Sequence, residues 1–138
     1  MLDDRGQPQA LHKDGRRYEV STAAWAMYPG LIEAINTHQS YGSDGDRHQE
    51  IRDRSQFLWQ ALQSMEGVTT VSPTPPESGL VAFQLTSGHH ARAVEHLEQS
   101  RIYLRQILNP DCLRASLHYF TTESEIKTLI DGIAKLVS

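Results

Sequence analysis

Residues 112–126 read CLRASLHYFTTESEI, a stretch that predicts a β-strand carrying one arginine and then the capped start of a helix. The two-residue period of a strand places Leu113, Ala115, Leu117 and Tyr119 on one face and Arg114, Ser116, His118 and Phe120 on the other. Arg114 therefore faces away from the apolar row. One interpretation is that Arg114 is a solvated strand residue. The functional interpretation is a guanidinium held on a rigid strand, where it binds a carboxylate through two parallel hydrogen bonds.

The remaining pattern predicts an α/β chain in which helices alternate with short strands. Thr122 and Glu125 have the spacing of a capping box, so a final helix is predicted to run from there to the end of the chain. The other predicted elements are helices from Pro29 to His38, from about Asp46 to Met65 and from about His89 to Gln99, and strands Val68–Val71, Leu80–Leu85 and Ile102–Arg105. This order predicts a small sheet covered by helices on one side.

Arg105 and Arg114 are predicted to lie on neighbouring strands, because the residues between them include the turn-forming sequence Asn109-Pro110-Asp111. Both guanidinium groups would then converge on one anionic ligand, such as a carboxylate. The alternative is that one or both arginines pair with surface acids such as Asp111.

Composition narrows the class of protein and its partners. The chain has 138 residues, with 38% hydrophobic and 22% charged residues, which is ordinary for a globular domain. A net charge of -4 and a pI near 5.9 argue against a nucleic-acid partner. No stretch approaches the roughly 20 apolar residues that cross a bilayer, and the single cysteine fits a reducing compartment, so a cytoplasmic location is expected. No metal site is predicted, because His89, His90 and His96 lack accompanying ligands and are interpreted as solvent-facing helix residues.

The tail of the chain resembles the class V aminotransferases, which are enzymes that use pyridoxal phosphate (PLP). The family signature is R-x-S, an aromatic-rich strand end, T and E-E-I, and it is matched here by Arg114, Ser116, Tyr119, Thr121, Thr122, Glu125 and Ile126. The resemblance implies the small, mainly antiparallel sheet covered by helices that forms the C-terminal domain of fold type I PLP enzymes. It also implies that Arg114 binds the α-carboxylate of an amino-acid substrate.

A second segment, Gly15–Trp25, is similar to the family sequence R-[FY]-E-x-G-T-x-N, in which the threonine reaches the cofactor phosphate of the other subunit of a homodimer. Thr22 occupies that position, whereas Ser21 and Ala24 replace the usual glycine and asparagine. The resemblance therefore implies a cofactor-binding role for Thr22. It also implies that residues 17–138 form the C-terminal small domain, preceded by an irregular arm or large-domain remnant over residues 1–16.

Within this family the chain looks most similar to the cysteine/cystine C–S lyases, whose cystine substrate has two carboxylates for Arg114 and Arg105. Cysteine desulfurases carry a longer loop with a nucleophilic cysteine here, and Cys112 is interpreted instead as a small, partly buried filler. The alternatives are another class V member, namely an aminotransferase, an epimerase or a desulfurase-like enzyme, or a stand-alone non-catalytic domain with the same fold.

No catalytic residue is assigned to this chain. Lys13 follows a histidine, as the Schiff-base lysine of the family does, but it lies far too close to Arg17 to match the family spacing. Lys127 and Lys135 lie on the predicted final helix, where no cofactor context surrounds them. PLP is therefore expected in a full-length parent, where a large domain supplies the lysine, and not on this chain alone.

Overall fold

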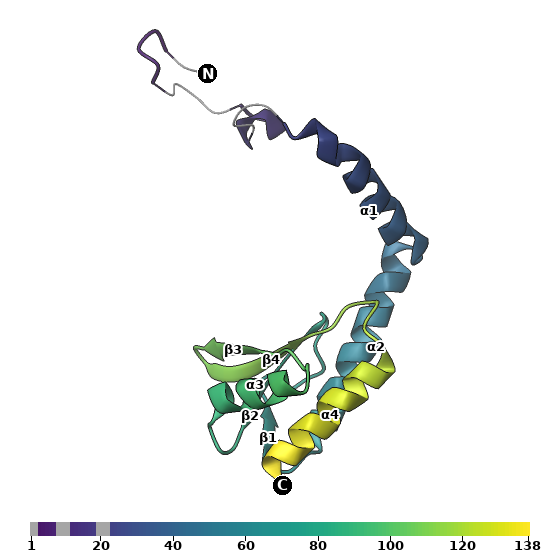
Figure 1. Ribbon diagram of the computed structural model, residues 1–138, viewed down its shortest axis with the longest axis vertical. Coiled ribbons are helices and arrows are strands. Elements are labelled where there is room, and N and C mark those ends of the chain that lie inside the picture. The colour runs from purple at the N-terminus through teal and green to yellow at the C-terminus, as the bar shows by residue number, and fades with distance from the viewer. Residues whose placement is uncertain (1–2, 8–11, 19–22) are drawn as a thin grey trace. The chain divides into compact units, whose positions relative to one another are not determined.

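The computed structural model describes residues 3–7, 12–18 and 23–138, which form two compact units, Met1–Tyr41 and Gly42–Ser138. The first unit contains the 3-10 helices Gly15–Tyr18 and Trp25–Met27 and the helix α1, Tyr28–Ser40 (Figure 1). Pro29 lies in the first turn of α1, as predicted, because its missing N–H is not needed there. Among the described residues of this unit none is buried, and the apolar side chains of α1 are exposed.

The second unit is a four-stranded antiparallel sheet with three helices. Its elements are α2 (Asp44–Gln63), β1 (Val68–Thr70), β2 (Leu80–Leu85), α3 (His90–Gln99), β3 (Arg105–Leu108), β4 (Asp111–Ser116) and α4 (Glu123–Val137). The strand order is β1-β2-β4-β3, and each neighbouring pair is antiparallel. The predicted mixed α/β fold with a small antiparallel sheet is confirmed.

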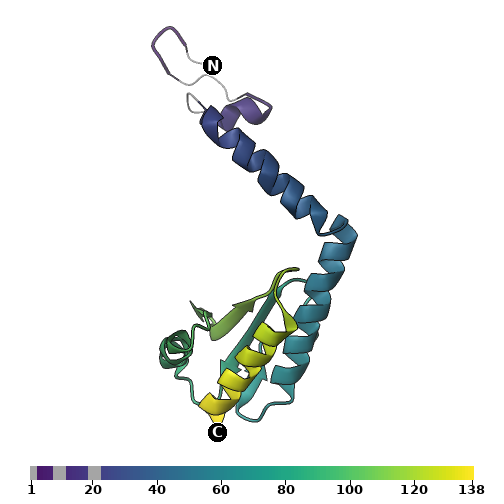
Figure 2. The ribbon, with the colours of Figure 1, turned by 45° about the vertical axis from the view of Figure 1, so that its right-hand side comes forward.

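One face of the sheet carries the hydrophobic core. Phe83 on β2 is the register partner of Leu113 on β4, and both side chains are fully buried. Helices α2 and α4 contact each other and supply Leu62 and Ile133 to the same core, and Ala93 places α3 on this face as well (Figures 1 and 2). Burying each large apolar side chain stabilises the fold by about 1.5–3 kcal/mol. The opposite face carries Arg105 and Arg114 together with the smaller side chains of Ala82 and Cys112.

The strand predicted over Ile102–Arg105 is wrong in its bounds, because β3 begins only at Arg105. Helix α3 ends in a Schellman turn, in which Arg101 has a φ of 59° and the Ile102 N–H donates to the Leu97 carbonyl. Residues 102–104 therefore leave the helix without pairing to β4, and Ile102 and Leu104 pack against the core instead.

Both long helices of the second unit begin at a capping box. Thr122 and Glu125 form the predicted one at α4, and Ser43 with Asp46 forms another at α2, which therefore begins at Asp44. Within the described ranges no helix combines the length and apolar character needed to cross a membrane.

Candidate functional site

Arg105 on β3 and Arg114 on β4 are register partners in the antiparallel ladder. Side chains of directly opposed residues leave the sheet on the same face, so the two arginine side chains start from neighbouring positions on that face. Arg105 is exposed and Arg114 is half-buried. The predicted juxtaposition of the two arginines on one side of the sheet is confirmed.

The two arginines belong to a row that crosses three strands on the face opposite the core. Ala82 on β2 is the partner of Arg114 on its other side. Ser116, two residues after Arg114, is exposed on the same face. The row therefore carries the exposed donors of Arg105 and Ser116 beside the half-buried guanidinium of Arg114.

The arginine pair lacks counter-charges among the residues that the structure describes. The ion pairs there link other residues, and Arg114 Nε is buried with no hydrogen-bond partner. Like charges directly opposed across strands are destabilising, and an unpaired buried donor costs about 1–3 kcal/mol. An anion that accepts hydrogen bonds from both guanidinium groups removes both costs.

Asp111, the acid considered as an arginine partner, contacts other groups instead. Its Oδ1 accepts a hydrogen bond from Gln106 Nε2 at 2.8 Å, and its Oδ2 lies 3.0 Å from His90 Nδ1. These contacts, with the Gln106 hydrogen bond as the largest cause, hold the pKa of the Asp111 carboxyl below its usual range. Asp111 is therefore ionised near neutral pH and engaged away from the two guanidinium groups.

His90 is the one histidine of the 89–96 segment for which the predicted solvent-facing position is wrong, since only 4% of it is exposed. The Leu85 N–H donates to His90 Nε2 at 3.0 Å. A signal in the sequence pointed to this burial, because His90 shares helical spacing with Ala93 and Leu97, which are both buried. His89 and His96 are exposed, as predicted.

Cys112 shares the face of Arg114 by strand periodicity and is buried. Burial, reinforced by the negative charge of Asp111, raises the pKa of the Cys112 thiol. A buried thiol with a raised pKa is a poor nucleophile, because the thiolate is the reactive form. The interpretation of Cys112 as a small filler fits this environment.

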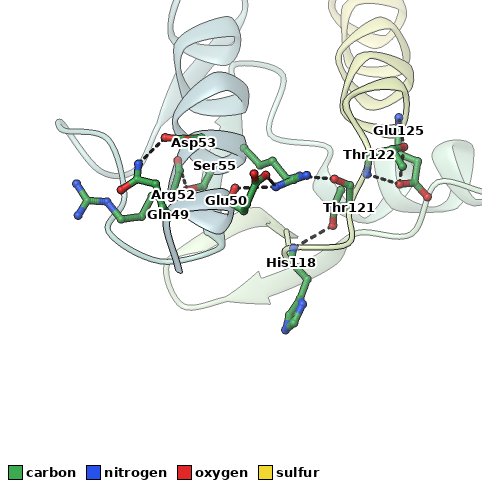
Figure 3. A network of polar contacts seen from close by, with 10 residues as sticks. Gln49, Glu50, Arg52, Asp53, Ser55, His118, Thr121, Thr122 and Glu125 are labelled. Carbon is green, nitrogen blue, oxygen red and sulfur yellow. Dashed lines mark hydrogen bonds and ion pairs between the residues drawn. The ribbon is translucent and has the colours of Figure 1, made fainter. Parts of the chain in front are cut away.

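The loop that follows β4 is fixed by a polar network (Figure 3). Arg54 on α2 donates from Nε to the Thr121 carbonyl and pairs with Glu50, and Thr121 Oγ1 accepts from the His118 N–H at 2.9 Å. Thr122 and Glu125 then cap α4. Beside this loop a cavity of about 350 Å³ lies between residues 100–104, the end of β4 and the start of α4. Neither arginine of the pair lines it.

A family model for aminotransferase class V matches residues 5–129. The chain belongs to the class V aminotransferase family. Among relatives of known function, the isopenicillin N epimerase of Amycolatopsis lactamdurans is 25% identical over 118 residues, which are 81% of this chain and 29% of that enzyme.

Among solved structures, this chain is similar to a lyase. The cystine C–S lyase C-DES, in complex with its product cysteine persulfide, is 40% identical, with a TM-score of 0.81 over 97% of this chain. The cysteine desulfurase of Thermococcus onnurineus NA1 has a TM-score of 0.77 at 20% identity, which shows the shared fold alone. The chain spans 35% of C-DES and 36% of the desulfurase.

C-DES binds PLP, since one of its structures holds glycine linked covalently to that cofactor. The described residues of this chain do not by themselves fit a complete PLP site. Lys127, paired with Glu123 at 2.6 Å, and Lys135 lie on α4, which covers the sheet face opposite the arginine pair. Lys13 is exposed in the first unit, and Thr22, the predicted phosphate ligand, lies outside the described residues. Within the part of the chain that the structure describes, no cluster of three or more metal-ligating side chains is present.

Proposed function

We propose that this chain supplies the substrate-carboxylate-binding domain of a PLP-dependent cysteine/cystine C–S lyase. The observation that carries the proposal is the unpaired arginine pair, Arg105 and Arg114, on the uncovered face of the sheet. Identity of 40% to the cystine C–S lyase C-DES supports this reaction over others in the family. Residues 17–138 correspond, in this proposal, to the C-terminal small domain.

Arg114 binds the α-carboxylate of the substrate. The Arg114 side chain is half-buried and its Nε has no partner, so a carboxylate bound to this guanidinium supplies an acceptor in a poorly solvated place. A guanidinium offers two parallel donors to the two oxygens of one carboxylate, which fixes the orientation of the substrate as well as its position.

Arg105 binds the second carboxylate when the substrate is cystine. It is the more exposed partner of the pair and lies at the start of an edge strand, so it can adjust to the far end of a longer substrate. Its position directly opposite Arg114 also raises the positive potential that attracts the first carboxylate.

The cofactor chemistry belongs to other parts of the enzyme. PLP, when bound, acts as an electron sink for the substrate carbon skeleton, and a large domain supplies its lysine. Thr22 contacts the cofactor phosphate of the neighbouring subunit in a homodimer. This chain's own arginines bind and orient the amino acid in a cytoplasmic enzyme.

An epimerase is the second candidate, favoured by the 25% identity to isopenicillin N epimerase. An enzyme that inverts one stereocentre has no general need for a second carboxylate contact. The dependence of catalysis on Arg105 therefore separates the two reactions. A desulfurase is less well supported, because Cys112 is buried on a strand.

The test is kinetic and uses the enzyme in which this chain is joined to its large domain. Arg114→Lys keeps the charge but loses the bidentate geometry, so kcat/KM for cystine should fall about 100-fold, equivalent to about 2–3 kcal/mol. Arg105→Lys should weaken cystine turnover more than cysteine turnover. The absorption spectrum of the cofactor should stay normal in both variants.

Arg92→Lys serves as the matched control, because Arg92 is an exposed arginine on α3, whereas the pair lies on β3 and β4. It should leave kcat/KM unchanged. Wild-type cystine turnover by Arg114→Lys at low substrate concentration would contradict the proposal.

A further inference from the structure

We infer that His90 and Asp111 act as positioning residues for the arginine pair, by holding the β3–β4 hairpin in the register that places Arg105 opposite Arg114. The inference rests on the proposed function, since it concerns how that site is built. Neither residue contacts the substrate in this scheme. They act through the hairpin.

His90 uses its two ring nitrogens differently. The Leu85 N–H donates to Nε2 at 3.0 Å, so Nε2 carries a lone pair and the ring proton of the neutral imidazole is on Nδ1. Nδ1 lies 3.0 Å from Asp111 Oδ2, a close polar contact that does not have the geometry of a hydrogen bond. The imidazole therefore connects the end of β2 to the first residue of β4. The buried ring keeps water from competing for the Leu85 contact, whereas the Asp111 carboxylate is half-exposed.

Asp111 is held from three elements at once. Besides His90 on α3, Gln106 on β3 donates to its carboxylate at 2.8 Å, and Gln84 on β2 donates to its backbone carbonyl at 2.8 Å. Gln106 lies opposite the core residue Leu113, whereas Gln84 directly follows the core residue Phe83 on its strand. The two contacts therefore come from the two faces of the sheet. Asp111 is thus fixed relative to both neighbouring strands.

The register depends on this fixed point. Asp111 pairs with Leu108, and the same ladder brings Arg114 opposite Arg105. A slip of one residue in β3 would move Arg105 to the other face of the sheet, away from Arg114. At the Arg105–Arg114 end of the ladder, repulsion between two like charges favours separation of β3 from β4. The contacts of Asp111 stabilise the opposite end of the same short hairpin.

Two substitutions at His90 separate the contacts. In His90→Gln the side-chain oxygen takes the place of Nε2, so the Leu85 contact is kept and the Asp111 contact is lost. In His90→Asn the side-chain amide takes the place of Nδ1, so the donor to Asp111 is kept and the Leu85 contact is lost. The pair therefore distinguishes positioning through Asp111 from a general loss of packing.

The measurement is an NMR titration of the 138-residue chain with L-cystathionine, a soluble diamino dicarboxylate, followed at the Arg105 and Arg114 Nε–H signals. His90→Gln should raise the dissociation constant about fivefold, the effect of one lost polar contact to Asp111, and should speed hydrogen exchange at Ile107 and Arg114. His90→Asn should bind within about twofold of wild type, because the Asp111 contact is retained. Asp111→Asn, which loses one of its two acceptors, should match His90→Gln and replaces it if that variant does not fold.

The outcomes distinguish the two proposals. If the wild-type chain binds L-cystathionine no better than the Arg114→Lys variant does, the proposed function is contradicted and the inference fails with it. If the wild-type chain binds L-cystathionine through Arg114, and the His90→Gln and Asp111→Asn variants bind it equally well, the inference alone is overturned. Equal weakening in His90→Gln and His90→Asn would also overturn it, because it would show a packing effect.

Discussion

At the scale of single residues, neighbours on one strand have opposite chemistry. Arg114 keeps a buried donor without a partner, whereas Cys112, two residues earlier on the same face, is buried beside the carboxylate of Asp111. A guanidinium stays charged in such a place. A thiol stays protonated there. The face is therefore suited to binding an anion and not to nucleophilic attack by sulfur.

The single cysteine should react slowly in the folded chain. Because burial raises the pKa of Cys112, the thiolate fraction at pH 8 is reduced, and alkylation by iodoacetamide should be at least about tenfold slower than in urea. The alkylation rate of Cys112 should also begin to rise only at a higher pH than the alkylation rate of a free thiol does. The control is Ser100→Cys in a Cys112→Ser background, since Ser100 is exposed. Equal rates for the two proteins would contradict the burial of Cys112.

Gly79 should tolerate no side chain. A Cβ atom there would lie 2.0 Å from the Leu117 carbonyl oxygen, at the point where the Leu117 N–H donates to the Gly79 carbonyl at 2.7 Å. Gly79→Ala should therefore lower the free energy of unfolding by about 2–3 kcal/mol in urea titrations, because β2 and β4 must move apart. Gly45→Ala is the control, since its added methyl group makes only an ordinary contact with Ser43 at 3.7 Å. Equal stability of the two variants would show that the strands separate freely.

At the scale of elements, local hydrogen bonds set where the helices begin. The Thr122 hydroxyl accepts from the Glu125 N–H at 3.2 Å, and the Glu125 carboxylate accepts from the Thr122 N–H at 2.7 Å. Substituting such an N-cap by alanine costs about 1 kcal/mol. The same cap also holds the loop that follows the Arg114 strand (Figure 3).

The cap of α4 should make stability depend on acid. Its hydrogen bonds, those from the Thr122 N–H first, lower the pKa of Glu125 below 4.5 in the folded chain. This stabilisation is complete above the unfolded pKa and is lost as pH falls through the lower folded pKa. Glu125→Gln keeps the hydrogen-bonding geometry without the charge, so it should be less stable than wild type at pH 6. The difference in urea midpoint should disappear toward pH 3, and a constant difference would contradict a role for the charge.

At the scale of the whole molecule, the hydrophobic core belongs to one unit. All buried apolar side chains of the described residues lie in Gly42–Ser138, and the described residues before them contribute none. The helices pack on the sheet (Figure 2) and contribute to the core on one face, and the register places the arginine pair on the other face. The arginine pair therefore lies outside the main hydrophobic core.

Residues 42–138 should therefore fold alone. A chain that begins at Gly42 should unfold cooperatively in urea, with a free energy of unfolding within about 0.5 kcal/mol of the 138-residue chain, since it loses no buried side chain that the structure describes. Circular dichroism against urea measures this directly. A loss of more than about 2 kcal/mol would show that the first unit contributes to the core.

The features predicted well from sequence are those that neighbouring residues determine. The alternation in 112–117 assigned Arg114 and Leu113 to opposite faces, and the spacing of Thr122 and Glu125 located the start of α4. Strand β2 was predicted with its observed bounds, because Leu80–Leu85 is a compact apolar run between turn residues. Such signals act over one or two turns of backbone, so the sequence contains them completely.

Only the tertiary structure decided the features that depend on distant residues. The bounds of β3 follow from how α3 ends and from the ladder with β4, and an apolar run such as Ile102–Leu104 packs on the core as readily as it forms a strand. His90 is buried because Leu85 and Asp111 meet it from two strands. By itself the sequence determined that two arginines lie close together on short strands. Their exact opposition, and their lack of counter-charges, required the register of the sheet, because pairing partners are chosen by the packing of the whole unit.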